Sequence, residues 1–145
     1  MTAFPPPGPS PAPPPSDRAP SAPDGAALLT APVLEHAPLR VRPGRTAAFE
    51  AAMREALPLI AAAPGFRGAR VSRSVESPEA YLLLVGWESV AAHEEGFRGS
   101  AAHGRWRELL HRFYDPHPVV EHHVAVLGAD PAGPARPAAR TAVAE

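Results

Sequence analysis

The hydrophobic pattern between positions 33 and 127 switches four times between the period of a strand and that of a helix. This order constrains the fold more than any other feature of the sequence. Alternating or continuous apolar runs, which are typical of strands, occur at 33–41, 66–75, 80–88 and 119–127. Apolar residues with helical spacing run from about Arg45 to Ala63 and, after Ser89, to about Phe113. The order strand, helix, strand, strand, helix, strand is the split β-α-β pattern of the ferredoxin-like fold.

The expected fold is therefore of the α+β class, a ferredoxin-like βαββαβ domain with a four-stranded antiparallel sheet. The expected strand order is 4-1-3-2, with both helices on one face of the sheet. The strand at 80–88 is apolar on both faces, so we expect it in the middle of the sheet. The strand at 33–41 alternates, so that Glu35 shares one face with Val33 while His36 points to the other.

Proline marks the expected limits of this domain. The chain has 145 residues and 21 prolines, many of which lie in the first 32 residues and after Gly128. Segments of this composition bury too little apolar surface to offset the entropy of ordering. We therefore expect residues 1–32 to form a disordered Pro/Ala-rich arm, 33–127 to form the folded domain, and 128–145 to form a disordered tail.

Charge and cysteine content exclude several classes of function. The formal net charge is −1, and the 11 arginines between residues 33 and 127 match 11 acidic residues, so no basic face for nucleic acid is expected. The absence of cysteine excludes disulfides and thiolate chemistry. No apolar run approaches the roughly 20 residues that span a bilayer. We expect a cytoplasmic protein without a membrane or nucleic-acid partner.

The predicted sheet has a second face that the two helices do not cover. Strand residues on that face remain apolar, and a sheet needs another layer to bury them. A second copy of the chain, packed sheet against sheet, is the simplest cover. The sequence therefore predicts a homodimer.

Five short motifs of this domain carry a family resemblance. They are Pro43-Gly44, Pro64-Gly65-Phe66, Trp87-Glu88-Ser89, the stretch from Ser100 to Trp106, and Val120-Glu121-His122. Together with the strand order, they resemble the antibiotic-biosynthesis-monooxygenase-like family of dimeric α/β-barrel proteins. The resemblance covers roughly residues 33–127 and implies the dimeric barrel fold. The family includes cofactor-independent oxygenases, haem-degrading enzymes and other branches, so the resemblance implies that the protein belongs to one of them.

The resemblance separates two of these branches. The haem-degrading branch uses an Asn, a Trp and a His, and alignment on Trp87 places Ala37, Gly96 and Trp106 at those positions. All three differ, which argues against haem degradation. The oxygenase branch uses no metal or organic cofactor, because an aromatic substrate in its enolate or phenolate form itself gives the electron to oxygen. Trp87 matches a pocket residue of that branch.

Six residues are the candidate site. His36, His103 and His122 are candidate general bases, since a neutral imidazole takes up a proton near pH 7. Aromatic walls for a substrate are expected from Trp87, Trp106 and Phe113. Each has alternatives. The aromatic residues could be plain core or interface packing. Neighbouring first and last strands could instead place His36 and His122 with Glu35, Glu121 and His123 as a zinc or iron site, or as surface polar pairs.

The leading hypothesis is a cofactor-independent monooxygenase that acts on a small aromatic or quinone-like molecule, with no metal. The alternative is a non-catalytic dimeric domain that binds a small molecule or a partner. The alternative predicts a pocket lined almost wholly by apolar groups, with every histidine outside it. The monooxygenase hypothesis predicts that at least two of His36, His103 and His122 converge on one cavity.

Overall fold

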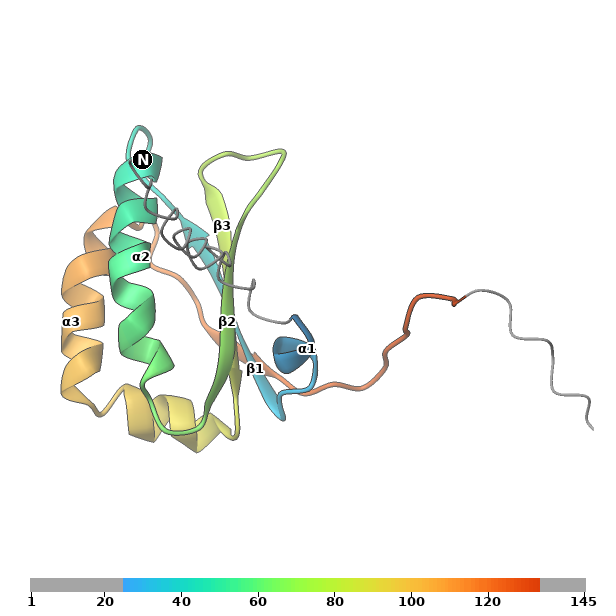
Figure 1. Ribbon diagram of the computed structural model, residues 1–145. Coiled ribbons are helices and arrows are strands. Elements are labelled where there is room, and N and C mark those ends of the chain that lie inside the picture. Colours follow the sequence, from blue (N-terminus) through green and yellow to red (C-terminus); the bar gives the residue numbers. More distant parts are fainter. Residues whose placement is uncertain (1–24, 134–145) are drawn as a thin grey trace, which may run out of the picture.

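The computed structural model describes residues 25–133, so most of the predicted arm and tail lie outside the described residues. Four antiparallel strands form one sheet in the order β2-β3-β1-β4 (Figure 1), which is the predicted order. The strands are β1 (Val33–Arg40), β2 (Phe66–Arg73), β3 (Ala80–Trp87) and β4 (Glu121–His123). The helices are α1 (Gly25–Leu29), α2 (Thr46–Ala61), the π-helix η1 (Ala92–Phe97), α3 (Ala101–Leu110) and the 3₁₀ turn η2 (His111–Phe113). The ferredoxin-like prediction is confirmed.

The two long helices α2 and α3 lie together on one face of the sheet (Figure 1). The inner face of β1 and β3 meets them. Along these strands, buried side chains of the inner face alternate with half-buried or exposed ones of the outer face, and β3 ends in three consecutive buried residues. The largest completely buried side chains are Trp87, Phe49, Phe113, Ile60 and Leu110. The core therefore fills the space between sheet and helices, and the predicted faces of the strand at 33–41 are confirmed.

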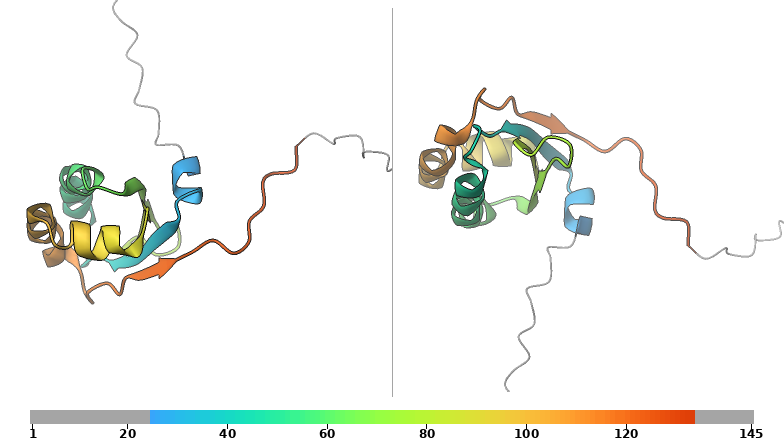
Figure 2. Two further views of the ribbon diagram at one scale, coloured as in Figure 1. Left: turned by 90° about the horizontal axis from the view of Figure 1, so that it is seen from below. Right: turned by 90° about the horizontal axis from the view of Figure 1, so that it is seen from above.

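The short helix α1 lies on the opposite face of the sheet (Figures 1 and 2). Its Leu28 and the following Ala31 pack where β2 and β3 carry glycines. A Cβ atom at Gly86 would lie 2.8 Å from the Cβ of Ala31, and one at Gly68 would lie 3.7 Å from Leu28. Only glycine permits so close an approach at Gly86. Residues 28 and 31, which belong to the predicted arm, thus pack on the sheet rather than extend away from it.

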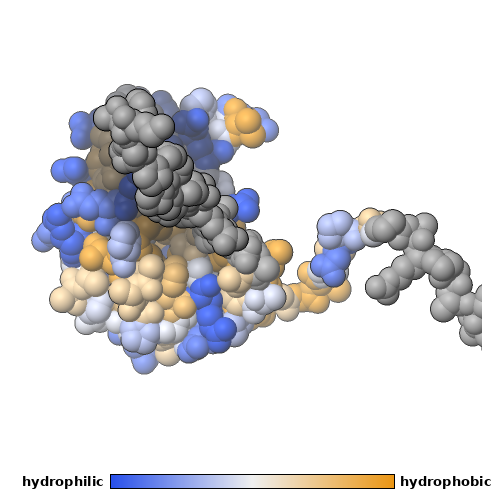
Figure 3. All heavy atoms as spheres, viewed as in Figure 1, coloured by the Kyte–Doolittle hydropathy of each residue, from blue (hydrophilic) through white to orange (hydrophobic). Residues whose placement is uncertain are grey.

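The final strand is shorter than predicted. The sequence predicts a strand over 119–127, whereas β4 pairs with β1 only at Glu121–His123. After His123 the chain leaves the sheet (Figure 2), and Val124 and Leu127 are 67 and 94 % exposed. This extension presents apolar surface to solvent (Figure 3). Alternation alone predicts a strand here, but a strand forms only where a neighbouring strand supplies hydrogen bonds.

The second helical segment is divided into two helices, η1 and α3. Ser89 accepts a hydrogen bond from the Ala92 N–H at 3.0 Å and so caps the start of this segment. The first part is a π-helix, in which the Arg98 N–H donates to the His93 carbonyl at 3.0 Å. Ser100 then caps α3.

Within residues 25–133, no helix is long and apolar enough to cross a membrane. The cytoplasmic location and the lack of a nucleic-acid partner stay predictions from the sequence.

Candidate functional site

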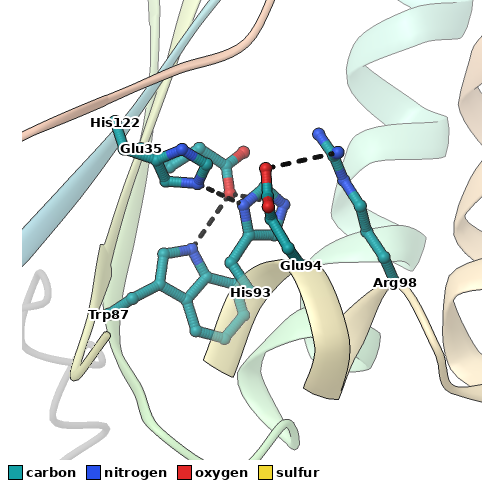
Figure 4. Close-up of polar contacts among 6 residues, drawn as sticks. All are labelled: Glu35, Trp87, His93, Glu94, Arg98 and His122. Carbon is teal, nitrogen blue, oxygen red and sulfur yellow. Dashed lines mark hydrogen bonds and ion pairs between the residues drawn. The ribbon is translucent and has the colours of Figure 1, made fainter. Parts of the chain in front are cut away.

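The centre of the site is a buried carboxyl group on the inner face of β1. Glu35 is only 4 % exposed although its neighbours on that face are apolar. Trp87 at the end of β3 donates its indole Nε1–H to Glu35 Oε1 at 3.0 Å, and His93 Nε2 lies 3.1 Å from the same oxygen (Figure 4). A buried acid needs such partners because its desolvation is costly. Three elements, β1, β3 and η1, thus meet at one oxygen atom.

His93 connects this carboxyl to the edge of the sheet. Its ring stacks on Trp87 with centroids 5.3 Å apart and an angle of 15° between planes. Its Nδ1 lies 2.8 Å from Nε2 of His122 on β4 (Figure 4). One proton is shared in each contact, and the tautomers decide which atom donates. The result is a continuous chain Glu35–His93–His122, mostly buried and ending at the edge strand.

The register of β4 on β1 decides which histidine joins the chain. Glu35 pairs with His122, and His36 pairs with Glu121. His122 therefore faces inward with Glu35, whereas His36 faces outward and packs its ring against His123 with centroids 5.4 Å apart. The two histidines that the sequence singled out together thus lie on opposite faces of the sheet.

Burial sets the charge state of the Glu35–His93 pair. Burial raises the pKa of Glu35, against the opposing effects of the Trp87 hydrogen bond and the Arg98 charge. Burial also lowers the pKa of His93 to about 3, helped by the nearby Arg98, His122 and His103. His93 is therefore neutral at physiological pH. Proton uptake by Glu35 is favoured relative to an exposed carboxyl.

A cavity of about 470 Å³ opens beside this chain, between the sheet and the second helical segment. Its volume falls in the range of roughly 300–1,000 Å³ found for small-molecule sites. Part of its wall is apolar: Leu39, Ile60, Leu83, Phe97, Trp106 and Val120. The polar part includes Glu35, His93, Arg98, His103, Arg107 and His111. Such a cavity can bind an apolar molecule and also exchange a proton with it.

One face of α3, continued by the residue that caps its C-terminal end, supplies three of the polar groups. His103, Arg107 and His111 follow each other at four-residue intervals, so they share one face of the helix. The pKa of His103 and that of His111 are both lowered, chiefly by burial and then by the Arg107 charge. Both imidazoles are thus favoured in the neutral form.

Two of the predicted residues line the cavity, namely His103 and Trp106. Trp87 is completely buried and does not line the cavity. It contacts two residues that do, because it donates a hydrogen bond to Glu35 and stacks on His93. Phe113 is also completely buried and packs on Phe49 with ring centroids 5.9 Å apart, outside the cavity lining.

His122 contacts the cavity residue His93 but is not itself part of the lining, and His36 lies on the far face of the sheet. The expectation that at least two of the three candidate bases converge on the cavity is therefore not met, because only His103 lines it. In the described part of the chain, no three His, Asp or Glu side chains are grouped to hold a metal ion.

Comparison with known proteins places the chain in a family. Residues 32–109 match the sequence pattern described as antibiotic biosynthesis monooxygenase. The chain belongs to this family. The match includes β1, η1 and most of α3, so Glu35, Trp87, His93 and His103 all lie within it, whereas His122 lies beyond it.

The chain is similar in sequence to one curated protein and in fold to several solved structures. An uncharacterized Bacillus subtilis protein, YczJ, is 46 % identical over 90 residues, which is 62 % of this chain and 95 % of YczJ. A Bordetella bronchiseptica structure, named as a proposed antibiotic biosynthesis monooxygenase, is 41 % identical with a TM-score of 0.63, covering 66 % of this chain and 97 % of that one. A Caulobacter crescentus structure, 23 % identical, shows the same fold with a TM-score of 0.58, covering 66 and 90 %.

Sequence reasoning missed His93 and the arginines of the cavity. The position of Glu35 was a usable signal, because a charged residue on an apolar strand face indicates a paired or functional carboxyl. His93 and Arg98 carry no such signal, since they lie five residues apart across a π-helix.

Proposed function

We propose that this protein is a cofactor-independent monooxygenase that acts on an aromatic or quinone-like small molecule. One observation carries the proposal: the cavity combines an apolar wall with neutral imidazoles and two guanidinium groups. The apolar wall suits a flat ring system, with Trp106 and Leu83 as large contact surfaces. Neutral imidazole is the form that accepts a proton, so His93 and His103 are both in the form needed at the start of the reaction.

The chemistry asks three things of the protein. A base removes a proton from a phenol or from a ring CH₂ that is conjugated with a carbonyl. Positive charge from Arg98 stabilises the resulting anion. The anion then gives electrons to O₂: an anthrone-type CH₂ becomes a carbonyl, one oxygen atom enters the product and the other leaves as water. The substrate supplies all four electrons, so no cofactor is required for the balance.

His103 is the best candidate for the base. Its side chain is half-buried in the cavity wall, and among the described residues its imidazole has a ring contact with Phe97 but no hydrogen-bond partner. His93, by contrast, has both ring nitrogens in contact, with Glu35 and with His122. We therefore assign proton removal to His103. His93 and His122 are positioning residues that pass a proton between the cavity and the sheet edge.

Oxygen uptake tests this function. The purified protein is incubated with a panel of anthrones and hydroquinones, and oxygen consumption is followed with an electrode. We expect uptake above the buffer rate, a fall of about a hundredfold in His103→Gln, and no change in the matched variant His36→Gln on the far face. Uptake no faster than buffer across the panel would rule out the catalytic assignment. Equal activity of His103→Gln and wild type would rule out His103 as the base.

The non-catalytic alternative finds less support. It predicts an almost wholly apolar pocket with every histidine outside. Four histidines line the cavity: His93, His103, His111 and His117. The arrangement therefore favours the monooxygenase proposal over simple binding.

We also propose the homodimer that the sequence predicts. Leu82 and Leu84 point away from the buried inner face of β3 and stay half-exposed on the sheet surface beside α1. A second copy would bury them. Sedimentation velocity at micromolar concentration should show a dimer. Leu84→Glu should shift it to monomer, whereas Val75→Glu at a 93 % exposed position should not. A wild-type monomer would contradict this proposal.

A further inference from the structure

The wall of the cavity carries more positive than negative charge. Arg98 and Arg107 both line it, and Glu35 is its single acidic residue. The whole chain, in contrast, has a formal net charge of −1. The positive charge is therefore a local property of the cavity rather than of the protein.

The carboxyl of Glu35 does little to neutralise this charge. It is committed to Trp87 and His93 at 3.0 and 3.1 Å, and burial favours its protonated form. Arg98 has one weak ion pair with Glu94 at 3.9 Å, between side chains that are both substantially exposed. Such a pair holds its charges loosely.

Arg107 has no counter-ion among the described residues. Within residues 25–133 it makes no ion pair and no side-chain hydrogen bond. Its helix neighbour Arg105, two residues earlier, points elsewhere and pairs with both Glu55 at 3.2 Å and Glu108 at 3.4 Å. Both side chains are exposed, but they differ: Arg105 is neutralised by two carboxylates, whereas Arg107 is unpaired among the described residues and lines the cavity.

The surroundings of Arg107 suit an anion attached to a ring system. His103 and His111 flank it one turn before and one turn after on the same helix face. Trp106 and Leu39 supply apolar wall nearby in the same cavity. A guanidinium group presents two parallel N–H donors that match the two oxygens of a carboxylate.

We propose that the cavity selects aromatic substrates that carry a carboxylate, and that Arg107 binds this group. The ring system then lies along the apolar wall, and its reacting end reaches His103. This rests on the proposed function only in taking the cavity as the substrate site. The inference adds the substrate class, an aromatic carboxylic acid, and the residue that recognises its carboxylate, Arg107.

Isothermal titration calorimetry with two probes tests the inference. The probes are 6-hydroxy-2-naphthoate and 2-naphthol, which share the ring and hydroxyl and differ in the carboxylate. We expect wild type to bind the naphthoate at least about tenfold more tightly than the naphthol. Arg107→Gln should lose about tenfold for the naphthoate with little change for the naphthol. Arg107→Lys keeps the charge but loses the two parallel N–H donors. Its affinity for the naphthoate should lie between those of wild type and Arg107→Gln.

Arg54→Gln is the matched control, since Arg54 is exposed on α2, unpaired among the described residues and outside this cavity. It should leave both affinities unchanged. Equal affinity for the two probes, no binding of either probe, or an equal loss in Arg54→Gln would overturn the inference.

The results separate this inference from the proposed function. Oxygen uptake from neutral anthrones without carboxylate preference would keep the function and overturn the inference. An Arg107-dependent preference without oxygen uptake would keep the inference and overturn the function.

Discussion

Trp87 and Glu35 lie 52 positions apart in the sequence and are joined by a buried hydrogen bond of 3.0 Å. Trp87 is completely buried and Glu35 is 4 % exposed, so neither group can turn to water instead. An unpaired buried donor or acceptor costs about 1–3 kcal/mol, and more when the group is charged. This bond therefore stabilises the contact between β1 and β3 and also fixes the carboxyl that meets His93.

Replacing Trp87 should show how much the bond contributes. Trp87→Phe removes the N–H donor and part of the buried ring, so we expect the free energy of unfolding to fall by about 2–4 kcal/mol. Trp106→Phe is the control, because Trp106 is similarly buried but has no hydrogen bond within the described residues. It should cost about 1 kcal/mol less than Trp87→Phe. Urea denaturation measures both, and equal losses would contradict the role given to the bond.

The His93 ring should make the protein sensitive to acid. Its pKa is lowered to about 3 from 6.5, so between these values the unfolded chain binds a proton that the folded chain does not. Stability from this group is complete above pH 6.5 and is lost as the pH falls. As the pH falls below 6.5, the free energy of unfolding of the wild type should therefore decrease by up to about 1.4 kcal/mol per pH unit more than that of His93→Gln.

Glu35 acts in the opposite sense. Its pKa is raised from 4.5, so its contribution is complete below pH 4.5 and is lost as the pH rises through the folded value. Glu35→Gln should therefore steepen the loss of stability on acidification, which His93→Gln should flatten. Urea titrations at several pH values test both. Parallel profiles for wild type and His93→Gln would refute the assignment.

The adjacent histidines of β4 should behave differently. His122 contacts His93 Nδ1 at 2.8 Å on the inner face, whereas the His123 side chain is 51 % exposed and lies 3.8 Å from Glu121. His122→Ala should lower the free energy of unfolding by about 1–2 kcal/mol, and His123→Ala should change it by less than about 0.5 kcal/mol. His122→Ala should also shift the pH profile of oxygen uptake. Identical behaviour of the two variants would exclude a special role for His122.

Two glycines should respond in opposite directions to alanine. Gly104 lies inside α3 with open space at its Cβ position, so Gly104→Ala should stabilise the fold by about 0.5–1 kcal/mol. Gly65 has a φ of +84°, and a Cβ there would lie 2.7 Å from the Cβ of Ala92. Gly65→Ala should destabilise by about 1–3 kcal/mol. Thermal unfolding distinguishes the two, and a stabilised Gly65→Ala would contradict the geometry.

Periodicity was sufficient to predict the strand order and the faces of β1, because both depend on local alternation and on a small set of allowed topologies. The site depends on two other quantities. One is the register of β4 on β1, which pairs His122 with Glu35 and turns His36 outward. The other is the backbone geometry of η1. Neither the register nor the π-helical backbone produces a periodic pattern in the sequence. The sequence could therefore indicate individual residues such as His103 and Trp106, but not which residues contact one another in the site.

The π-helical turn of η1 also bears on how relatives should be compared. Its hydrogen bond from Arg98 to His93 spans five residues where an α-helix spans four, and both residues line the cavity. Removing a single residue here would restore an α-helix and rotate one of the two side chains out of line with the other. A one-residue gap in an alignment between these positions would therefore mark a homologue with different site chemistry, even where every aligned side chain is identical.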